Sequence, residues 1–347
     1  FRSEREREID LHRWLQFEMD VQLARAARAA RDMPVGIYQD LAAGSSPGGS
    51  DVWNRKSLFA LDAHVGAPPD PLAPQGQNWG LAPLNPHSLR ADGYDYWIRL
   101  VRHGLEHSGA LRIDHVMGLF RSFWVPQGAG GRGGAYVRMP APDLLGIPAL
   151  ESARRSALIV GEDLGTVPAD VPPALRRWSV LSTRVLYFDR DRGGFRPARR
   201  YPKAALAAAN THDLATIAGW WEGRDIAFRS RHGLHGTGGS AAGAERERRR
   251  QRQELLRLLR LRESDVDAPD FLRRLVDAVH DFLRATPARL VAFSLDDLNG
   301  ERDPVNMPGV GQGLYPSWRR RSRVTVEATF DRWHGILSQR AHDRERQ

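Results

Sequence analysis

The 347-residue sequence predicts an α/β fold in which about six short apolar strands alternate with helices. Two observations predict this class. Short apolar segments recur along the chain, and stretches with helical periodicity lie between them. In addition, an acidic residue closes five of the six apolar segments. Alternation of this kind is typical of a parallel sheet or of a barrel of β/α units.

The predicted elements follow in order. Residues 8–31 carry apolar side chains at three- and four-residue steps, which predicts an amphipathic helix that ends before Pro34. The six strands are expected within residues 34–42, 110–114, 156–165, 182–189, 204–213 and 288–298. Helices are expected over about 92–108, 149–155, 171–179 and 269–284. Residues 1–347 are expected to form a single domain built from these β/α units.

Two stretches interrupt this rhythm. Residues 44–90 are rich in Gly, Pro and Asn and predict a long loop, a kind of segment that is often functional. Residues 229–262 are Gly- and Ser-rich and then Arg- and Glu-rich, which predicts a flexible loop followed by a solvated helix. A basic interaction helix is the alternative for the second half.

Composition excludes several classes. The formal net charge is +9, but only Lys56 and Lys203 are lysines, so the Arg excess indicates compositional bias rather than a nucleic-acid surface. The sequence has no apolar run of the roughly 20 residues that a membrane span needs. A charged N-terminal stretch argues against a signal peptide. The absence of cysteine excludes disulfides and fits a cytoplasmic protein.

Carboxylates gather where the predicted strands end. These residues are Asp40, Asp114, Glu162 with Asp163, Asp213, and Asp296 with Asp297. In a β/α barrel the carboxyl ends of the strands form the active-site face, so the sequence predicts a carboxylate-rich site. Such a site suits either a divalent metal held by oxygen ligands or acid/base work on a glycosidic bond. Tryptophans that follow the strands favour a sugar, although each alone could be a core residue: Trp53, Trp79, Trp124, Trp220 and Trp221.

Five segments carry a resemblance to a known family. They are LRIDHVMGLFRSFWVP, IVGEDLGTVP, NTHDLAT, HVGAPPDPLAPQGQNWGLAPLNP and LDDLNGERDPVNMPGVGQGLYPSWRRR. Together they resemble the amylomaltases, or 4-α-glucanotransferases, a branch of the α-amylase superfamily. The resemblance implies a (β/α)8 TIM barrel with long inserted loops, of which about six of the eight units are present here. The first two strands of that barrel, with a sugar-stacking tyrosine segment, are expected upstream of residue 1.

The resemblance also assigns catalytic roles in a retaining double displacement. It implies that Asp114 is the nucleophile and that Glu162 is the acid and then the base. Asp213 would grip the 2- and 3-hydroxyls of the distorted sugar. Because side chains two apart on a strand share a face, Arg112 should orient Asp114 and keep it ionised. Asp163 should point to the opposite face and be structural.

Further residues are expected to contact an α-1,4-glucan. His212 and His115 flank the carboxylates and can donate to sugar hydroxyls. In the loop that would cover the cleft, Gln77, Asn78 and Trp79 are expected to touch glucan, and Asp70 lies in the same loop. A closing loop would keep water out and favour a sugar acceptor. The resemblance implies no metal and no organic cofactor.

Alternatives stay open at this point. An α-glucan hydrolase would use the same residues, with water as the acceptor. A phosphohydrolase would instead place a divalent metal at the carboxylates and use the pair His212 and Asp213. A chain without two barrel strands could also be an inactive glucan-binding fragment or a basic nucleic-acid binder.

Overall fold

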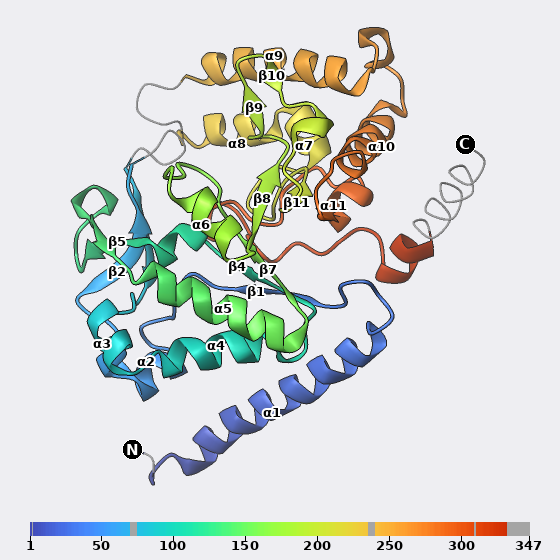
Figure 1. The fold of residues 1–347 in the computed structure, drawn as a ribbon. Helices are drawn as coiled ribbons and strands as arrows, with labels where there is room; N and C mark the ends of the chain where they lie inside the picture. The colour runs from blue at the N-terminus through green and yellow to red at the C-terminus, as the bar shows by residue number, and fades with distance from the viewer. Residues whose placement is uncertain (2, 70–74, 235–239, 309, 332–347) are drawn as a thin grey trace. The chain divides into compact units, whose positions relative to one another are not determined.

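The computed structural model describes residues 1, 3–69, 75–234, 240–308 and 310–331. The chain forms two compact units, the first comprising residues 1–69 and 75–183 and the second beginning at residue 184. Figure 1 shows the elements of both. Among the described residues, no helix is both long and apolar enough to cross a bilayer.

In the first unit, parallel strands pair in the order β1 (Tyr38–Leu41), β4 (Ala110–Ile113), β7 (Leu158–Gly161) and β8 (Leu181–Val185). The four predicted strands are confirmed. The helices α4 (Asp95–Glu106), α5 (Ala141–Arg155) and α6 (Val171–Arg177) alternate with them. Their buried faces share one core with β4 and β7, built from Trp97, Val101, Leu105, Leu111, Ile113, Leu144, Leu145, Ile159 and Leu175.

Two strands of a second, antiparallel sheet lie within the predicted loop 44–90, where the structure differs from the sequence prediction. It has four strands in the order β3 (Gln77–Leu81), β2 (Ala63–Ala67), β5 (Arg121–Pro126) and β6 (Ala135–Arg138). The short helices α2 (Ser50–Asn54) and α3 (Pro86–Ala91) flank β2 and β3 in the chain. Gly66 permits this pairing, because a Cβ there would lie 2.1 Å from the Gln77 carbonyl oxygen.

The predicted N-terminal helix is confirmed as α1 (Glu6–Ala29), the long blue helix in Figure 1. No residue of α1 is buried, although its apolar stripe predicted a packed face. Leu11, Trp14 and Met19 are each more than half exposed. The imidazole Nε2 of His107 lies 2.7 Å from Asp20, which links α1 to the end of α4.

In the second unit the end of β8 pairs with β11 (Ala205–Ala208), which pairs in parallel with β12 (Leu290–Ala292). These two predicted strands are also confirmed. This unit includes the helices α7 (Ile217–Glu222), α8 (Arg224–Arg231), α9 (Ala241–Leu259), α10 (Phe271–Arg284) and α11 (Leu295–Leu298), and β9 (Arg190–Asp191) pairs with β10 (Gly194–Phe195). The predicted helix within 229–262 is α9, but its Leu255 and Leu256 are core residues, so it is not a purely solvated helix.

Candidate active site

Asp114 lies directly after β4 and pairs with an arginine of the same strand. Its carboxylate is 2.8 Å from the Arg112 guanidinium, whose other amino group lies 2.6 and 2.7 Å from the two oxygens of Asp40. Burial disfavours the charged guanidinium, yet the hydrogen bond to Asp40 and the charges of both carboxylates hold the pKa of Arg112 above its ordinary value. The expectation that Arg112 and Asp114 share a face is confirmed, and the guanidinium fixes the orientation of Asp114.

Glu162 follows β7, the neighbouring parallel strand, and the register places Gly161 beside Ile113. The Glu162 carboxyl accepts the backbone N–H of His115 at 3.0 Å and that of Leu164 at 2.9 Å. The side chain is buried. Burial raises the pKa of Glu162 to about 7 against the opposing effect of the Leu164 N–H, and the charge of Asp114 adds to the rise. Glu162 can therefore hold a proton near neutral pH, as a general acid must.

The neighbouring Asp163 has a structural environment. Its carboxylate accepts the Ser182 hydroxyl and the Thr183 backbone N–H, each at 2.7 Å. Asp163 is 3% exposed, so these bonds join β7 to β8 inside the core. This geometry agrees with the expectation that Asp163 points to the face opposite Glu162.

An aromatic pair stands next to Asp114. The rings of Trp79 and His115 meet edge to face with centroids 5.1 Å apart, and the Trp79 indole N–H donates to Gln77 Oε1 at 3.1 Å. Burial lowers the pKa of His115, which favours its neutral form. Asn78 is exposed, lies on the other face of β3 and accepts the Gly80 N–H, so the structure does not group it with Gln77 and Trp79. Asp70 lies outside the described residues.

A cavity of about 180 Å³ opens beside these groups. Its lining includes Asp114, His115, Ser45, Tyr96 and Trp97. The Tyr96 hydroxyl lies 3.0 Å from that of Ser45 and 3.1 Å from an Asp51 carboxylate oxygen. Apolar walls with a few fixed polar groups are typical of small-molecule sites.

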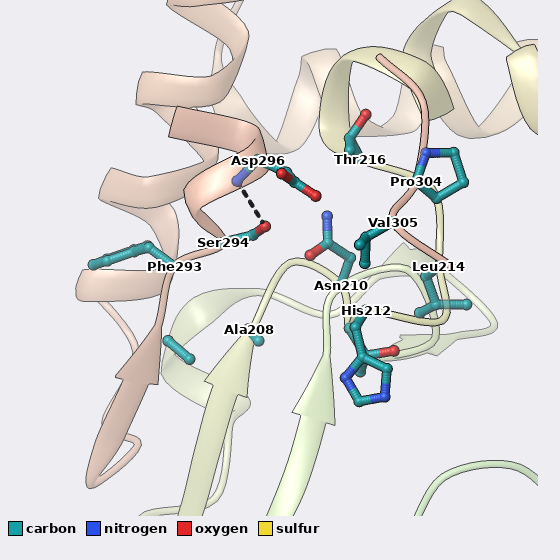
Figure 2. A pocket seen from close by; sticks show the side chains of 12 residues that line it. Ala208, Asn210, His212, Leu214, Thr216, Phe293, Ser294, Asp296, Pro304 and Val305 are labelled. Carbon is teal, nitrogen blue, oxygen red and sulfur yellow. Dashed lines mark hydrogen bonds between the residues drawn. The ribbon is translucent and has the colours of Figure 1, made fainter. Parts of the chain in front are cut away.

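The second unit holds its own candidate residues after β11. The Asn306 amide donates to Asp213 Oδ1 at 2.6 Å, and His212 Nε2 lies 3.4 Å from Asp213 Oδ2. The His212 ring also lies beside Trp318, with centroids 5.3 Å apart. A cavity of about 250 Å³ adjoins them, and Figure 2 shows His212 and Asn210 among its lining side chains. Sequence reasoning gave Asn306 and Trp318 no role; the only signal was their place in the last of the five segments.

The tryptophans divide into two sets. Trp220 and Trp221 are core residues at 4% and 8% exposure, and Tyr187 stacks on Trp220 at 5.1 Å. The expectation that they form part of a sugar cleft is therefore wrong for these two. Trp79 and Trp124 are half-buried, and Trp53 is 42% exposed. The structure brings Trp79 next to His115, a candidate sugar-contacting residue that follows Asp114 in the chain.

The described part of the chain contains no group of three or more His, Asp or Glu side chains arranged to hold a metal ion. The carboxylates after β4 and β7 are instead engaged by a guanidinium and by backbone N–H groups. A buried carboxyl group that can hold a proton, beside one that pairs with a guanidinium, suits acid/base chemistry on a glycosidic bond.

Comparison with known proteins shows which family the chain belongs to. A family described as 4-alpha-glucanotransferase matches residues 1–325. The chain belongs to the 4-alpha-glucanotransferase family. It is 36% identical over 327 residues to the 4-alpha-glucanotransferase of Haemophilus influenzae, covering 90% of this chain and 46% of that protein. It is 38% identical over 318 residues to the 4-alpha-glucanotransferase of Mycobacterium tuberculosis, covering 90% of this chain and 44% of that one.

The fold agrees with this family membership. The crystal structure of the Corynebacterium glutamicum amylomaltase superimposes with a TM-score of 0.85 at 36% identity, over 92% of this chain and 48% of that one. The prediction of a β/α fold of the amylomaltase type is confirmed. This member of the 4-alpha-glucanotransferase family spans about half the length of the curated relatives it matches.

Proposed function

We propose that this chain carries the catalytic carboxylates of a 4-α-glucanotransferase that moves α-1,4-glucan segments between maltooligosaccharides. One observation carries the proposal. The neighbouring carboxyl groups of Asp114 and Glu162 have contrasting environments, a guanidinium for the first and burial that raises the pKa to about 7 for the second. Two carboxyl groups held in different protonation states are the requirement for retaining glycoside chemistry. The relatives' names give the substrate class.

The proposed reaction has two displacements. In the first, an Asp114 oxygen bonds to the anomeric carbon while the bond to the leaving O4 breaks, and the Glu162 proton moves to that oxygen. In the second, the O4 hydroxyl of an acceptor glucan bonds to the same carbon, its proton returns to Glu162, and the ester to Asp114 breaks. Arg112 balances the charge on Asp114 in the resting state and again when the ester is cleaved.

The remaining candidate residues are proposed to bind the sugar. The Trp79 ring offers an apolar face beside His115, and Gln77 fixes its indole. We infer that Asp213, held by Asn306, binds the 2- and 3-hydroxyls of the reacting glucose and strengthens that hold in the transition state. His212 is proposed to donate to a neighbouring hydroxyl, and Asn78 and Asp70 to contact more distant glucose units. A cytoplasmic location, supported by the absence of cysteine, completes the proposal.

Incubation with maltotriose tests the function directly. A transferase converts it into glucose and a ladder of longer maltodextrins, which chromatography resolves. A hydrolase yields only shorter products. Activity that a chelator abolishes would instead support a metal-dependent phosphohydrolase, and binding of maltodextrin without turnover would support a glucan-binding fragment. Binding to nucleic acid that weakens steeply with salt would identify a basic binder.

The pH dependence of the first displacement should follow Glu162. Because the acid must be protonated to assist the leaving group, kcat/KM for maltotriose is expected to fall about tenfold per pH unit above about pH 7. A maltosyl fluoride donor needs no such proton, so its kcat/KM should lack this limb. Identical limbs for both donors would contradict the acid role of Glu162. The measurement is initial rate against pH at low substrate concentration.

A further inference from the structure

The loop between β11 and α7 carries His212 and Asp213, and one buried carboxylate ties both of its ends. Asp297, in α11, accepts the Asn210 side-chain amide at 2.8 Å on one oxygen. Its other oxygen accepts the backbone N–H of Ile217 at 2.6 Å. Asn210 begins the loop and Ile217 begins α7, so a single side chain sets the distance that the loop must span.

The two hydrogen bonds that Asp297 accepts are buried and are not a surface contact. Asp297 is 2% exposed, and the two groups that donate to it, the Asn210 amide and the Ile217 backbone N–H, are uncharged. Burial raises the pKa of Asp297 to about 7, while the Ile217 and Asn210 donors favour the charged form. Burying a carboxyl group without a cation costs stability, which an apolar side chain of similar volume avoids. Stability is therefore a poor explanation for a carboxylate at this position.

Other bonds stiffen the same loop from within. The Asn210 amide and the Tyr187 hydroxyl both donate to the Ala215 carbonyl at 3.2 Å. The Thr216 hydroxyl accepts the Gly219 N–H at 3.0 Å and caps α7. The Asp213 carboxylate has a different partner, the Asn306 amide, which donates to it at 2.6 Å. The fixed ends therefore decide where the Asp213 carboxylate can lie.

We propose that Asp297 is a positioning residue, which holds the loop Asn210–Ile217 so that Asp213 meets the hydroxyls of the reacting sugar. Asp297 touches no substrate in this account and acts through Asp213. The inference rests on the proposed function, because it gives Asp213 a sugar to bind. Figure 2 shows Asn210 pointing from the end of β11 toward the segment that follows β12, where Ser294 and Asp296 lie.

The conservative variant Asp297→Asn isolates this effect. An amide keeps the volume but offers one acceptor oxygen where two N–H groups converge, so one end of the loop is released. Displacement of a binding group by about 1 Å can cost about 10²-fold in rate. We expect kcat for glucan transfer to fall tenfold or more while KM changes less than threefold, because Asp213 is proposed to act mainly in the transition state.

A double-mutant cycle separates positioning from a general structural defect. With maltosyl fluoride as donor, the effect of Asp297→Asn should nearly vanish in an Asp213→Asn background, since the group that it positions is gone. Asp189→Asn is the matched control, a carboxylate of the same unit that is 8% exposed and pairs with Arg196. It should lower thermal stability without changing kcat in either background.

Three outcomes decide the matter. Unchanged kcat in folded Asp297→Asn, or effects of Asp297→Asn and Asp213→Asn that multiply, overturn the inference. If Asp297→Asn does not fold, Asn210→Ser removes the same tie from the loop side and is judged by the same criteria. If the parent chain gives no transfer, the proposed function fails instead. In that case amide hydrogen exchange tests the hydrogen bonds of Asp297 without any need for activity. Exchange at Leu214 and Ile217 should become about tenfold faster in Asp297→Asn and stay unchanged in Asp189→Asn.

Discussion

Asp114→Asn is expected to abolish glucan transfer, with a loss on the order of 10³-fold or more in kcat. The amide cannot form the glycosyl ester, and it also loses the ion pair with Arg112. Asp114 is 37% exposed at its side chain, so the fold should tolerate the change with a loss of about 1 kcal/mol or less. Transfer is measured with maltotriose, and folding by thermal denaturation.

Asp92→Asn provides the control for this variant. Asp92 is a half-buried aspartate of the first unit that pairs with Arg55 at 3.3 Å, away from β4 and β7. Removing its charge should reduce stability to a similar extent and leave kcat within about twofold. Near-normal turnover in Asp114→Asn, or equal losses in the two variants, would refute the nucleophile role of Asp114.

Glu162→Gln should lower transfer from maltotriose by about 10²- to 10⁴-fold, the usual contribution of general acid catalysis. The amide oxygen can keep one of the two backbone N–H groups that Glu162 accepts, those of His115 and Leu164, and the other loses its acceptor, so we expect a modest loss of stability in a chain that still folds. With maltosyl fluoride the first displacement needs no acid, but the second still lacks its base. The glycosyl ester on Asp114 should therefore accumulate, and intact-protein mass spectrometry should detect it.

Glu151→Gln is the matched control for Glu162→Gln. Glu151 is 4% exposed, but the Arg102 hydrogen bond holds the pKa of Glu151 below its ordinary value, so it stays ionised. It should form no adduct and keep its kcat. A further readout is stability against pH. Since the pKa of Glu162 is raised from 4.5 to about 7, the free energy of unfolding should fall as pH rises through that range, and Gln should remove that decline.

The parallel strands could be predicted from the sequence because the patterns that identify them involve only residues close together in the chain. An apolar run such as Ala110–Ile113 that ends at Asp114 combines burial with a polar terminus in five residues. The pairing of Arg112 with Asp114 follows from the two-residue period of a strand. The antiparallel sheet escaped prediction because its strands β2 and β3 are short and contain Gly66 and Gly80, which weaken the alternation that identifies a strand.

Other parts of the site depend on contacts between distant residues, which local patterns do not encode. Asn306 reaches Asp213 across 93 positions, and Asp297 reaches Asn210 across 87. Composition also misled for Trp220 and Trp221, because an aromatic residue near a strand end fits a core as well as a sugar cleft. The site residues that the sequence did predict are those whose neighbours in the chain already define their chemistry.

The peptide bond between Asp114 and His115 connects the proposed nucleophile to the proposed acid. Its N–H donates to Glu162, and His115 holds a left-handed backbone with φ of 45°. Because this N–H belongs to the residue directly after Asp114, the main chain helps to set the distance between the two carboxyl groups. In glycoside chemistry that gap determines whether a water molecule fits between them and hence the anomeric configuration of the product. Under the proposed mechanism, the stereochemistry of the product therefore depends partly on a main-chain hydrogen bond, which the substitution of side chains does not remove.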